Sequence, residues 1–111
     1  MFSTERPIYR QIRDIIVARI LDSGDGALLP SVRALAAEAG VNPLTVAKAY
    51  HDLQSGGMVT AKKGVGLFAA DGAAIALLKA ERKLFLTEEW PRVQARMTRL
   101  GMGVEDLVER V

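Results

Sequence analysis

The sequence of 111 residues contains no cysteine and a single histidine, His51. The absence of cysteine excludes a disulfide framework and thiolate metal sites, and it is compatible with a reducing cytosol. With a lone histidine, no histidine cluster exists for a metal site or for a catalytic dyad. We therefore expect neither a bound metal nor a cofactor.

A long apolar run is also missing. No window of the sequence approaches the roughly 20 apolar residues that a membrane-spanning helix needs. The N-terminal stretch carries Glu5, Arg6 and Pro7 and therefore lacks the apolar core of a signal peptide. We expect a cytoplasmic protein without a membrane partner.

Catalytic motifs are missing as well. Gly64-Val65-Gly66 has no third glycine at the offset that a dinucleotide-binding loop requires, and no strand–turn–helix unit surrounds it. No carboxylate pair, activated nucleophile or phosphate-cradling loop stands out elsewhere. The sequence therefore predicts a protein that is not an enzyme.

The chain does contain amphipathic helix patterns, and 50% of its residues are hydrophobic, which is typical of a globular protein. Pro7 opens the first pattern, which ends near residues 23–26. Isoleucine is a modest helix former, so we expect burial of the stripe to hold this helix. The stripe consists of Ile8, Ile12, Ile15, Ile16 and Ile20.

Two short helix patterns follow it. In the first, Ser31 can cap the helix, apolar residues recur at the helical period over 32–39, and Gly40 stops it. In the second, Asn42 is a capping residue and Pro43 occupies the first helical position. The apolar stripe of the second helix contains Val46, Ala49, Tyr50 and Leu53. Two such helices joined by a tight turn predict a helix-turn-helix, although any helical hairpin shares this pattern.

The next segment favours the helix-turn-helix. Residues 58–63 and 65–70 read as two short strands around Gly64, with Lys62 and Lys63 at the tip. A hairpin directly after a helix-turn-helix is a wing. We therefore predict a mainly α fold with a small β-hairpin, in which residues 1–70 form a winged helix-turn-helix domain.

Charge is modest overall but placed where such a fold would use it. The net charge of +2 is too small to indicate nucleic-acid binding by itself. However, Arg33, Lys48, Lys62 and Lys63 come from elements that a winged fold brings to one side. This placement predicts double-stranded DNA as the partner.

The sequence also contains, in order, the segments Pro7-Ile8-Tyr9-Arg10-Gln11-Ile12, Leu29-Pro30-Ser31-Val32-Arg33-Ala34-Leu35-Ala36, Val41-Asn42-Pro43-Leu44-Thr45-Val46-Ala47-Lys48-Ala49-Tyr50 and Lys63-Gly64-Val65-Gly66-Leu67-Phe68. In order and spacing they resemble the signature of the GntR-type bacterial transcription regulators. The Asn42-Pro43 pair and the short tail are most similar to the YtrA-type branch of that family. That branch has a small helical C-terminal part in place of a large effector-binding domain.

The resemblance implies DNA contacts from the helix pair. The family's residue at the position of Arg33 contacts phosphate or guanine, whereas the alternative for Arg33 is a solvated surface charge. Asn42 could cap its helix, hydrogen-bond to DNA, or do both. Thr45 is a good phosphate donor, and Lys48 could reach guanine or phosphate. Leu44 replaces a polar residue of the family, which leaves apolar contact with a thymine methyl as its base readout.

The hairpin completes this set of contacts. Lys62 and Lys63 would approach phosphate or the minor groove, with Gly64 letting the backbone come close; the alternative is a solubilising hairpin tip. The predicted DNA-binding residues are Ser31, Arg33, Asn42, Leu44, Thr45, Lys48, Lys62, Lys63 and Gly64.

Residues 71–111 form a separate segment behind the wing. Its apolar stripes predict three helical segments, of which Thr87 caps the second. So many large apolar residues need either the winged domain or a second copy of the chain to cover them, and we favour a homodimer. The predicted dimer-interface residues are Leu78, Phe85, Leu86, Trp90 and Met97.

The sequence thus predicts a sequence-specific DNA-binding transcription regulator that acts as a homodimeric repressor at an inverted-repeat operator. The alternative is a winged-helix module that binds a protein and not DNA. A small-molecule effector is compatible with the resemblance and is not identified by the sequence.

Overall fold

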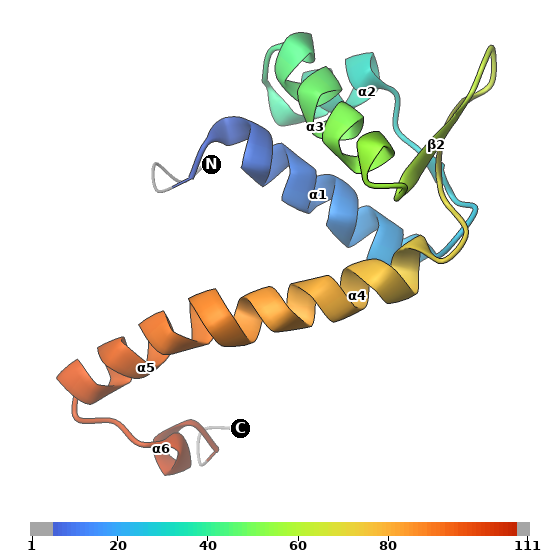
Figure 1. Cartoon of the computed structure of the whole chain (residues 1–111). Coiled ribbons are helices and arrows are strands. Elements are labelled where there is room, and N and C mark those ends of the chain that lie inside the picture. The colour runs from blue at the N-terminus through green and yellow to red at the C-terminus, as the bar shows by residue number, and fades with distance from the viewer. Residues whose placement is uncertain (1–5, 109–111) are drawn as a thin grey trace. The chain divides into compact units, whose positions relative to one another are not determined.

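The computed structural model describes residues 6–108, so residues 1–5 and 109–111 of the two predicted segments lie outside it. The chain divides into two compact units, Met1–Leu78 and Lys79–Val111, which we call the winged unit and the tail unit. Figure 1 shows the elements in order. They are α1 (Ile8–Ser23), β1 (Leu28–Leu29), α2 (Val32–Ala39), α3 (Pro43–Ser55), β2 (Val59–Lys62), β3 (Gly66–Ala69), α4 (Ala73–Leu84), the π-helical turn η1 (Phe85–Glu89), α5 (Trp90–Arg99) and α6 (Val104–Val108).

Helix α1 begins after Pro7, as predicted. Its buried residues are Ile12, Ile16, Val17 and Ile20, while Ile8 at the first turn is 48% exposed. The helix ends at Gly24, whose φ of 87° is a conformation that favours glycine and whose N–H donates to the carbonyl of Ile20 at 2.8 Å.

The predicted caps of α2 and α3 are present. The N–H of Ala34 donates to the Ser31 hydroxyl at 3.1 Å, and the N–H of Leu44 donates to Oδ1 of Asn42 at 2.9 Å. Gly40 ends α2 in the left-handed conformation, with φ of 69°. Gly40 and the Asn42 cap therefore fix the turn between the two helices, and Ser31 fixes the start of α2; all three are local sequence signals.

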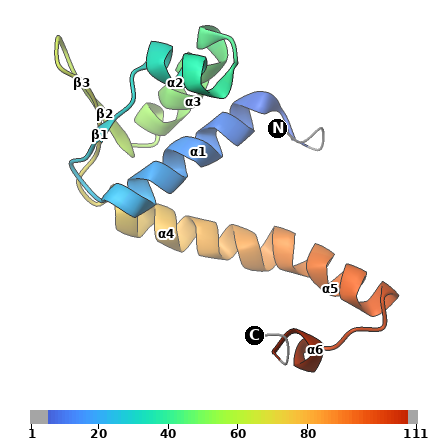
Figure 2. The same cartoon turned by 180° about the vertical axis from the view of Figure 1, so that it is seen from behind.

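The predicted hairpin forms part of a three-stranded antiparallel sheet with the order β1-β3-β2 (Figure 2). β2 and β3 pair from Val59 opposite Ala69 to Lys62 opposite Gly66. β1 pairs with the other edge of β3, placing Leu28 opposite Phe68. Periodicity does not reveal β1, because a strand of two residues has too few side chains to show alternation.

The core of the winged unit lies between α1, α2, α3 and the base of the sheet. Its largest fully buried side chains include Tyr50, Ile12, Ile16, Ile20, Leu35 and Leu53. Ala73 and Leu77 of α4 also belong to this core. The packed winged unit therefore includes the first part of α4. The predicted division of the chain into a DNA-binding part, 1–70, and a dimerisation part, 71–111, stays a prediction.

The start of α4 is tied to the end of α1. Oδ2 of Asp25 accepts the N–H of Gly72 at 2.8 Å, and Oδ1 accepts the N–H of Ala74 at 2.9 Å. The two backbone N–H groups, that of Ala74 first, lower the pKa of the Asp25 carboxyl below its usual value. This carboxylate acts as the cap of α4, although it lies far from α4 in the sequence.

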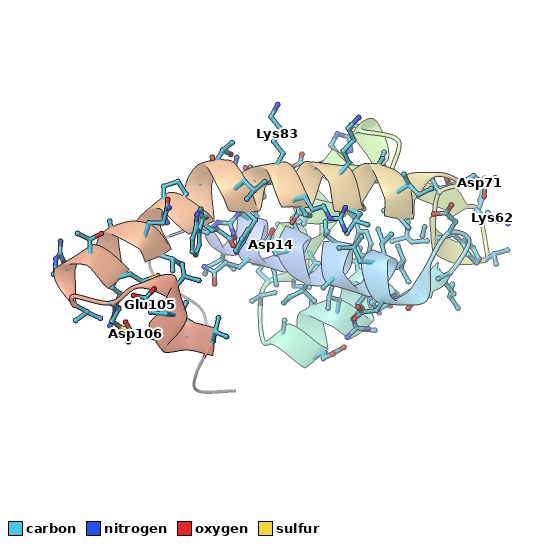
Figure 3. All side chains as sticks on the ribbon, turned by 90° about the horizontal axis from the view of Figure 1, so that it is seen from below. Asp14, Lys62, Asp71, Lys83, Glu105 and Asp106 are labelled. Carbon is cyan, nitrogen blue, oxygen red and sulfur yellow. The ribbon has the colours of Figure 1, made fainter. Side chains whose placement is uncertain are left out.

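The tail unit differs from the prediction at Thr87. The predicted boundary there is wrong, because α4, η1 and α5 follow one another without a break, and the Thr87 hydroxyl donates to the carbonyl of Lys83 at 2.8 Å. The proline at 91 lies at the start of α5, where its ring would crowd the carbonyl four residues earlier, and a wide π-turn relieves that contact. α6 is capped by Asp106, whose carboxylate accepts the N–H of Gly103 at 2.8 Å (Figure 3).

Residues 79–108 contain no buried side chain. Within the part of the chain that is described, no helix has the length and apolar character needed to cross a membrane.

Candidate nucleic-acid interface

Helix α3 presents its polar side to solvent. Val46, Ala49, Tyr50 and Leu53 are buried on the inner side. Lys48 is exposed and Thr45 is half-buried, while Leu44 at the first turn is 77% exposed. A leucine with this much exposed surface is not part of the core, so its apolar side chain is available to a ligand.

The caps of α2 and α3 leave hydrogen-bonding groups at the same helix ends. Asn42 uses Oδ1 for the cap, which leaves its Nδ2 amide as a donor. Ser31 is exposed at the start of α2, and Arg33 is exposed two residues later, in the first turn of the same helix. Asn42 therefore caps α3 and can still donate to a ligand.

One acidic residue of the helix pair, Glu38 on α2, has its charge compensated by an arginine. Glu38 forms an ion pair with Arg19 of α1, which joins α2 to α1. An exposed ion pair adds little stability, but it cancels the charge of Glu38 locally. Arg33 and Lys48 have no ion-pair partner among residues 6–108.

The hairpin carries its lysines at the far end. The N–H of Val65 donates to the carbonyl of Lys62 at 2.9 Å and closes the turn. Gly64 has φ of 76°, and a Cβ placed there would meet no atom within 4 Å. Gly64 is therefore open to solvent, and a ligand backbone can approach it closely. Figures 1 and 2 both show this turn extending beyond the helices, on the side of the winged unit where α2 and the start of α3 lie.

Aromatic rings hold two of the predicted lysines. Nζ of Lys48 lies 4.1 Å from the centroid of the Tyr9 ring on α1. Nζ of Lys62 lies 4.7 Å from the centroid of the Phe68 ring on β3. Both distances are typical of cation–π contacts. Sequence reasoning missed the roles of Tyr9 and Phe68; only the register of the hairpin could have indicated the second.

Tyr50 links α3 to the residue that precedes α2. Its hydroxyl donates to the carbonyl of Pro30, next to the cap residue Ser31. Burial raises the pKa of Tyr50 to about 12. Tyr50 is only 2% exposed, as its place on the predicted apolar stripe of α3 indicates. The hydrogen bond fixes the start of α2 relative to α3.

The predicted dimer residues are exposed or half-buried in their own units. Leu78, Phe85 and Leu86 are exposed, and Leu86 is 63% exposed. Trp90 and Met97 are half-buried and line a hollow of about 180 Å³ between α5 and α6. None of these five side chains belongs to the buried core of the described residues.

Comparison with known proteins gives a family match for most of the winged unit. The family described as bacterial regulatory proteins, gntR family, matches residues 4–68. The uncharacterized HTH-type transcriptional regulator YhcF of Bacillus subtilis is 34% identical over 113 residues, which cover 99% of this chain and 91% of that protein. The HTH-type transcriptional repressor YtrA of the same organism is 35% identical over 79 residues, covering 68% of this chain and 59% of YtrA.

Solved structures resemble both the whole chain and its winged part. A GntR family transcriptional regulator from Listeria monocytogenes superimposes with a TM-score of 0.74 at 30% identity, covering 99% of each chain. The DNA-binding domain of AraR in complex with operator ORX1 superimposes with a TM-score of 0.58 at 27% identity, covering 63% of this chain and 93% of that one.

Proposed function

The chain belongs to the GntR family of DNA-binding transcription regulators, as a YtrA-like member, and we propose that it is a homodimeric repressor that binds an inverted-repeat operator in the cytoplasm. Its relatives in this family are transcription regulators and not enzymes.

One observation carries the proposal for DNA contact. The start of α2 and the first turns of α3 carry exposed hydrogen-bond donors, one exposed leucine and two basic residues that have no ion-pair partner among residues 6–108. They lie on the same side of the winged unit as the hairpin turn (Figure 1). We assign base readout to Asn42, Leu44 and Lys48, because the N-terminal residues of a recognition helix reach base edges. AraR, which shares the winged fold, is bound to an operator in its structure.

The remaining predicted residues would fix the position of the protein on the duplex. Ser31, Arg33 and Thr45 are placed to contact phosphate oxygens. Lys62 and Lys63, with the open backbone at Gly64, would approach phosphates or the minor groove from the hairpin. Removing a phosphate contact should weaken binding to all DNA sequences equally and lower the salt dependence.

The proposal of a homodimer rests on the tail unit. Phe85, Leu86 and Val108 of this unit are large apolar side chains that are exposed. No side chain from 79 to 108 is buried. A segment with this composition is stable when another apolar surface covers it. A second copy supplies such a surface and also a second recognition helix, which a palindromic operator requires. A small-molecule effector would then bind at the seam between the copies.

The first experiment is a fluorescence-anisotropy titration of a DNA fragment selected from genomic DNA by the purified protein. The variant Lys62→Ala/Lys63→Ala should lose about tenfold or more in affinity, because it removes two phosphate contacts. Each lost contact should also reduce by about one the slope of log affinity against log salt concentration. The matched control Lys79→Ala/Lys83→Ala removes two exposed lysines of α4, and it should bind like the wild type.

Transcription from a promoter that carries the fragment tests the sign of regulation. A repressor lowers transcript yield as its concentration rises, whereas a rise in yield would show activation. Absence of DNA binding at low salt would instead favour the protein-interaction module.

A further inference from the structure

We infer that Tyr9 of α1 is a positioning residue for DNA binding, because its ring holds the ammonium of Lys48, a residue of the proposed recognition helix α3. The inference rests on the proposed function of Lys48. Tyr9 lies in the first turn of α1, which contains none of the predicted DNA-binding residues.

The geometry of the pair supports this role. Nζ of Lys48 lies 4.1 Å from the centroid of the Tyr9 ring, and the two residues come from helices that pack against each other. A ring face uses only one side of an ammonium, so the other N–H groups point away from the ring. These N–H groups stay available for a phosphate or a guanine edge.

The benefit of this arrangement is entropic. A free lysine side chain on a helix surface samples many rotamers, and ordering it on binding opposes association. Lys48 is exposed and has no carboxylate partner among residues 6–108. The Tyr9 ring restrains the side chain before DNA arrives, without neutralising its charge as an ion pair would.

The same arrangement recurs at the hairpin, which is a second observation in the same direction. Lys62 lies over the ring of Phe68, with 4.7 Å between Nζ and the ring centroid. Residue 60 faces Phe68 across the ladder, so Lys62 reaches the ring diagonally. Two of the basic residues assigned to DNA are therefore held by aromatic rings and not by acids.

The contact is tested first without DNA. In the wild-type protein, NMR signals of the Lys48 side-chain CH₂ next to the ammonium should be shifted upfield by the ring current of Tyr9. The shift should remain in Tyr9→Phe and disappear in Tyr9→Leu. Ordinary lysine shifts in the wild type would overturn the inference, whatever the outcome of the DNA experiments.

DNA titrations then test the consequence. Tyr9→Leu should weaken operator binding about two- to fivefold, the range that an exposed cation–π contact provides. Tyr9→Phe should bind within about twofold of the wild type. In a Lys48→Ala background, Tyr9→Leu should cause no further loss.

Three results would contradict the role. Equal losses in Tyr9→Phe and Tyr9→Leu would assign the effect to the hydroxyl, and an additive loss in the Lys48→Ala background would assign it to packing. An unchanged affinity in Tyr9→Leu would remove the effect altogether. Thermal unfolding of each variant identifies losses caused by destabilisation. A wild-type protein that binds no DNA would refute the proposed function, while the NMR test of the contact would still stand.

Discussion

The two units of this chain use apolar residues in opposite ways. In the winged unit the apolar stripes of α1, α2 and α3 face one another and produce side chains such as Ile12, Ile16 and Val46 with no exposed surface. In residues 79–108 comparable stripes lie on consecutive helical segments and leave every side chain at least partly exposed. The same local apolar pattern therefore forms a core only where the fold packs a second apolar face against it.

This difference assigns different tasks to the units. A unit with its own core can present polar groups rigidly, as α3 does through the Tyr50 hydrogen bond and the two caps. A unit without a core gains stability by association. Substitutions in each unit test this division of tasks.

The largest effect is expected in the core. Leu53→Ala should lower the free energy of unfolding by about 2–5 kcal/mol, because Leu53 is only 1% exposed and truncation leaves a cavity. Leu86→Ala is the matched control in the tail and should cost less than about 0.5 kcal/mol at protein concentrations where dimers are absent. Urea unfolding measures both. Similar losses would mean that the tail has a core of its own.

The dimer should depend on the tail. Phe85→Asp places a carboxylate on the exposed apolar stripe, and we expect the dimer dissociation constant to rise at least tenfold, about 1.4 kcal/mol. The control Lys83→Asp introduces the same carboxylate at a position whose side chain points away from α4 (Figure 3). Light scattering should report a halved mass for Phe85→Asp only. An unchanged mass would argue against this interface.

Lys48→Ala tests the polar side of the winged unit. We expect operator affinity to fall about three- to tenfold, which is the effect of losing one charged contact worth roughly 1 kcal/mol. Loss of the contact with Tyr9 should lower the free energy of unfolding by less than about 1 kcal/mol. Lys79→Ala is the control. Equal operator affinity for Lys48→Ala and wild type would remove Lys48 from the interface.

Tyr50→Phe removes the hydrogen bond to the Pro30 carbonyl and keeps the ring in the core. We expect a loss of about 1 kcal/mol in the free energy of unfolding at pH 7. Because burial raises the pKa of Tyr50 to about 12, the wild type should also lose stability as the pH rises from 10 toward 12, where only the unfolded chain is deprotonated at this site. Tyr50→Phe should lack this loss. Denaturant titrations at pH 9 and 11 give the comparison.

The smallest effect is expected at Asp25. Its lowered pKa means that the carboxylate stabilises the fold at neutral pH, and that this contribution disappears as the pH falls through the folded-state value below 3.8. Asp25→Asn should reduce stability slightly at pH 7 and show a weaker decline in acid. If the stability of Asp25→Asn falls in acid as steeply as that of the wild type, the Asp25 carboxylate does not stabilise the start of α4.

The winged unit was largely predictable because its signals are local. Ser31, Gly40, Asn42 and Pro43 each specify one cap or one turn, and all of them lie beside the element that they define. The β2–β3 hairpin was predictable for the same reason, whereas the third strand of the sheet, β1, was not. The boundaries and polar side of α3 therefore follow from the sequence.

The remaining features depend on contacts between distant residues. Asp25 caps a helix that begins 48 residues later, and Tyr9 meets Lys48 only because α1 packs on α3. Thr87 misled the prediction because a threonine can also bond back to the carbonyl four residues earlier, and here it does so inside a continuous helical stretch.

Whether two copies of the chain read a symmetric operator can be tested by sequencing the genomic DNA that the purified protein retains. We expect one enriched inverted repeat, with half-sites about one helical turn apart, roughly 10 base pairs. Retained DNA without an enriched sequence, or an enriched single half-site without symmetry, would contradict a paired recognition helix α3.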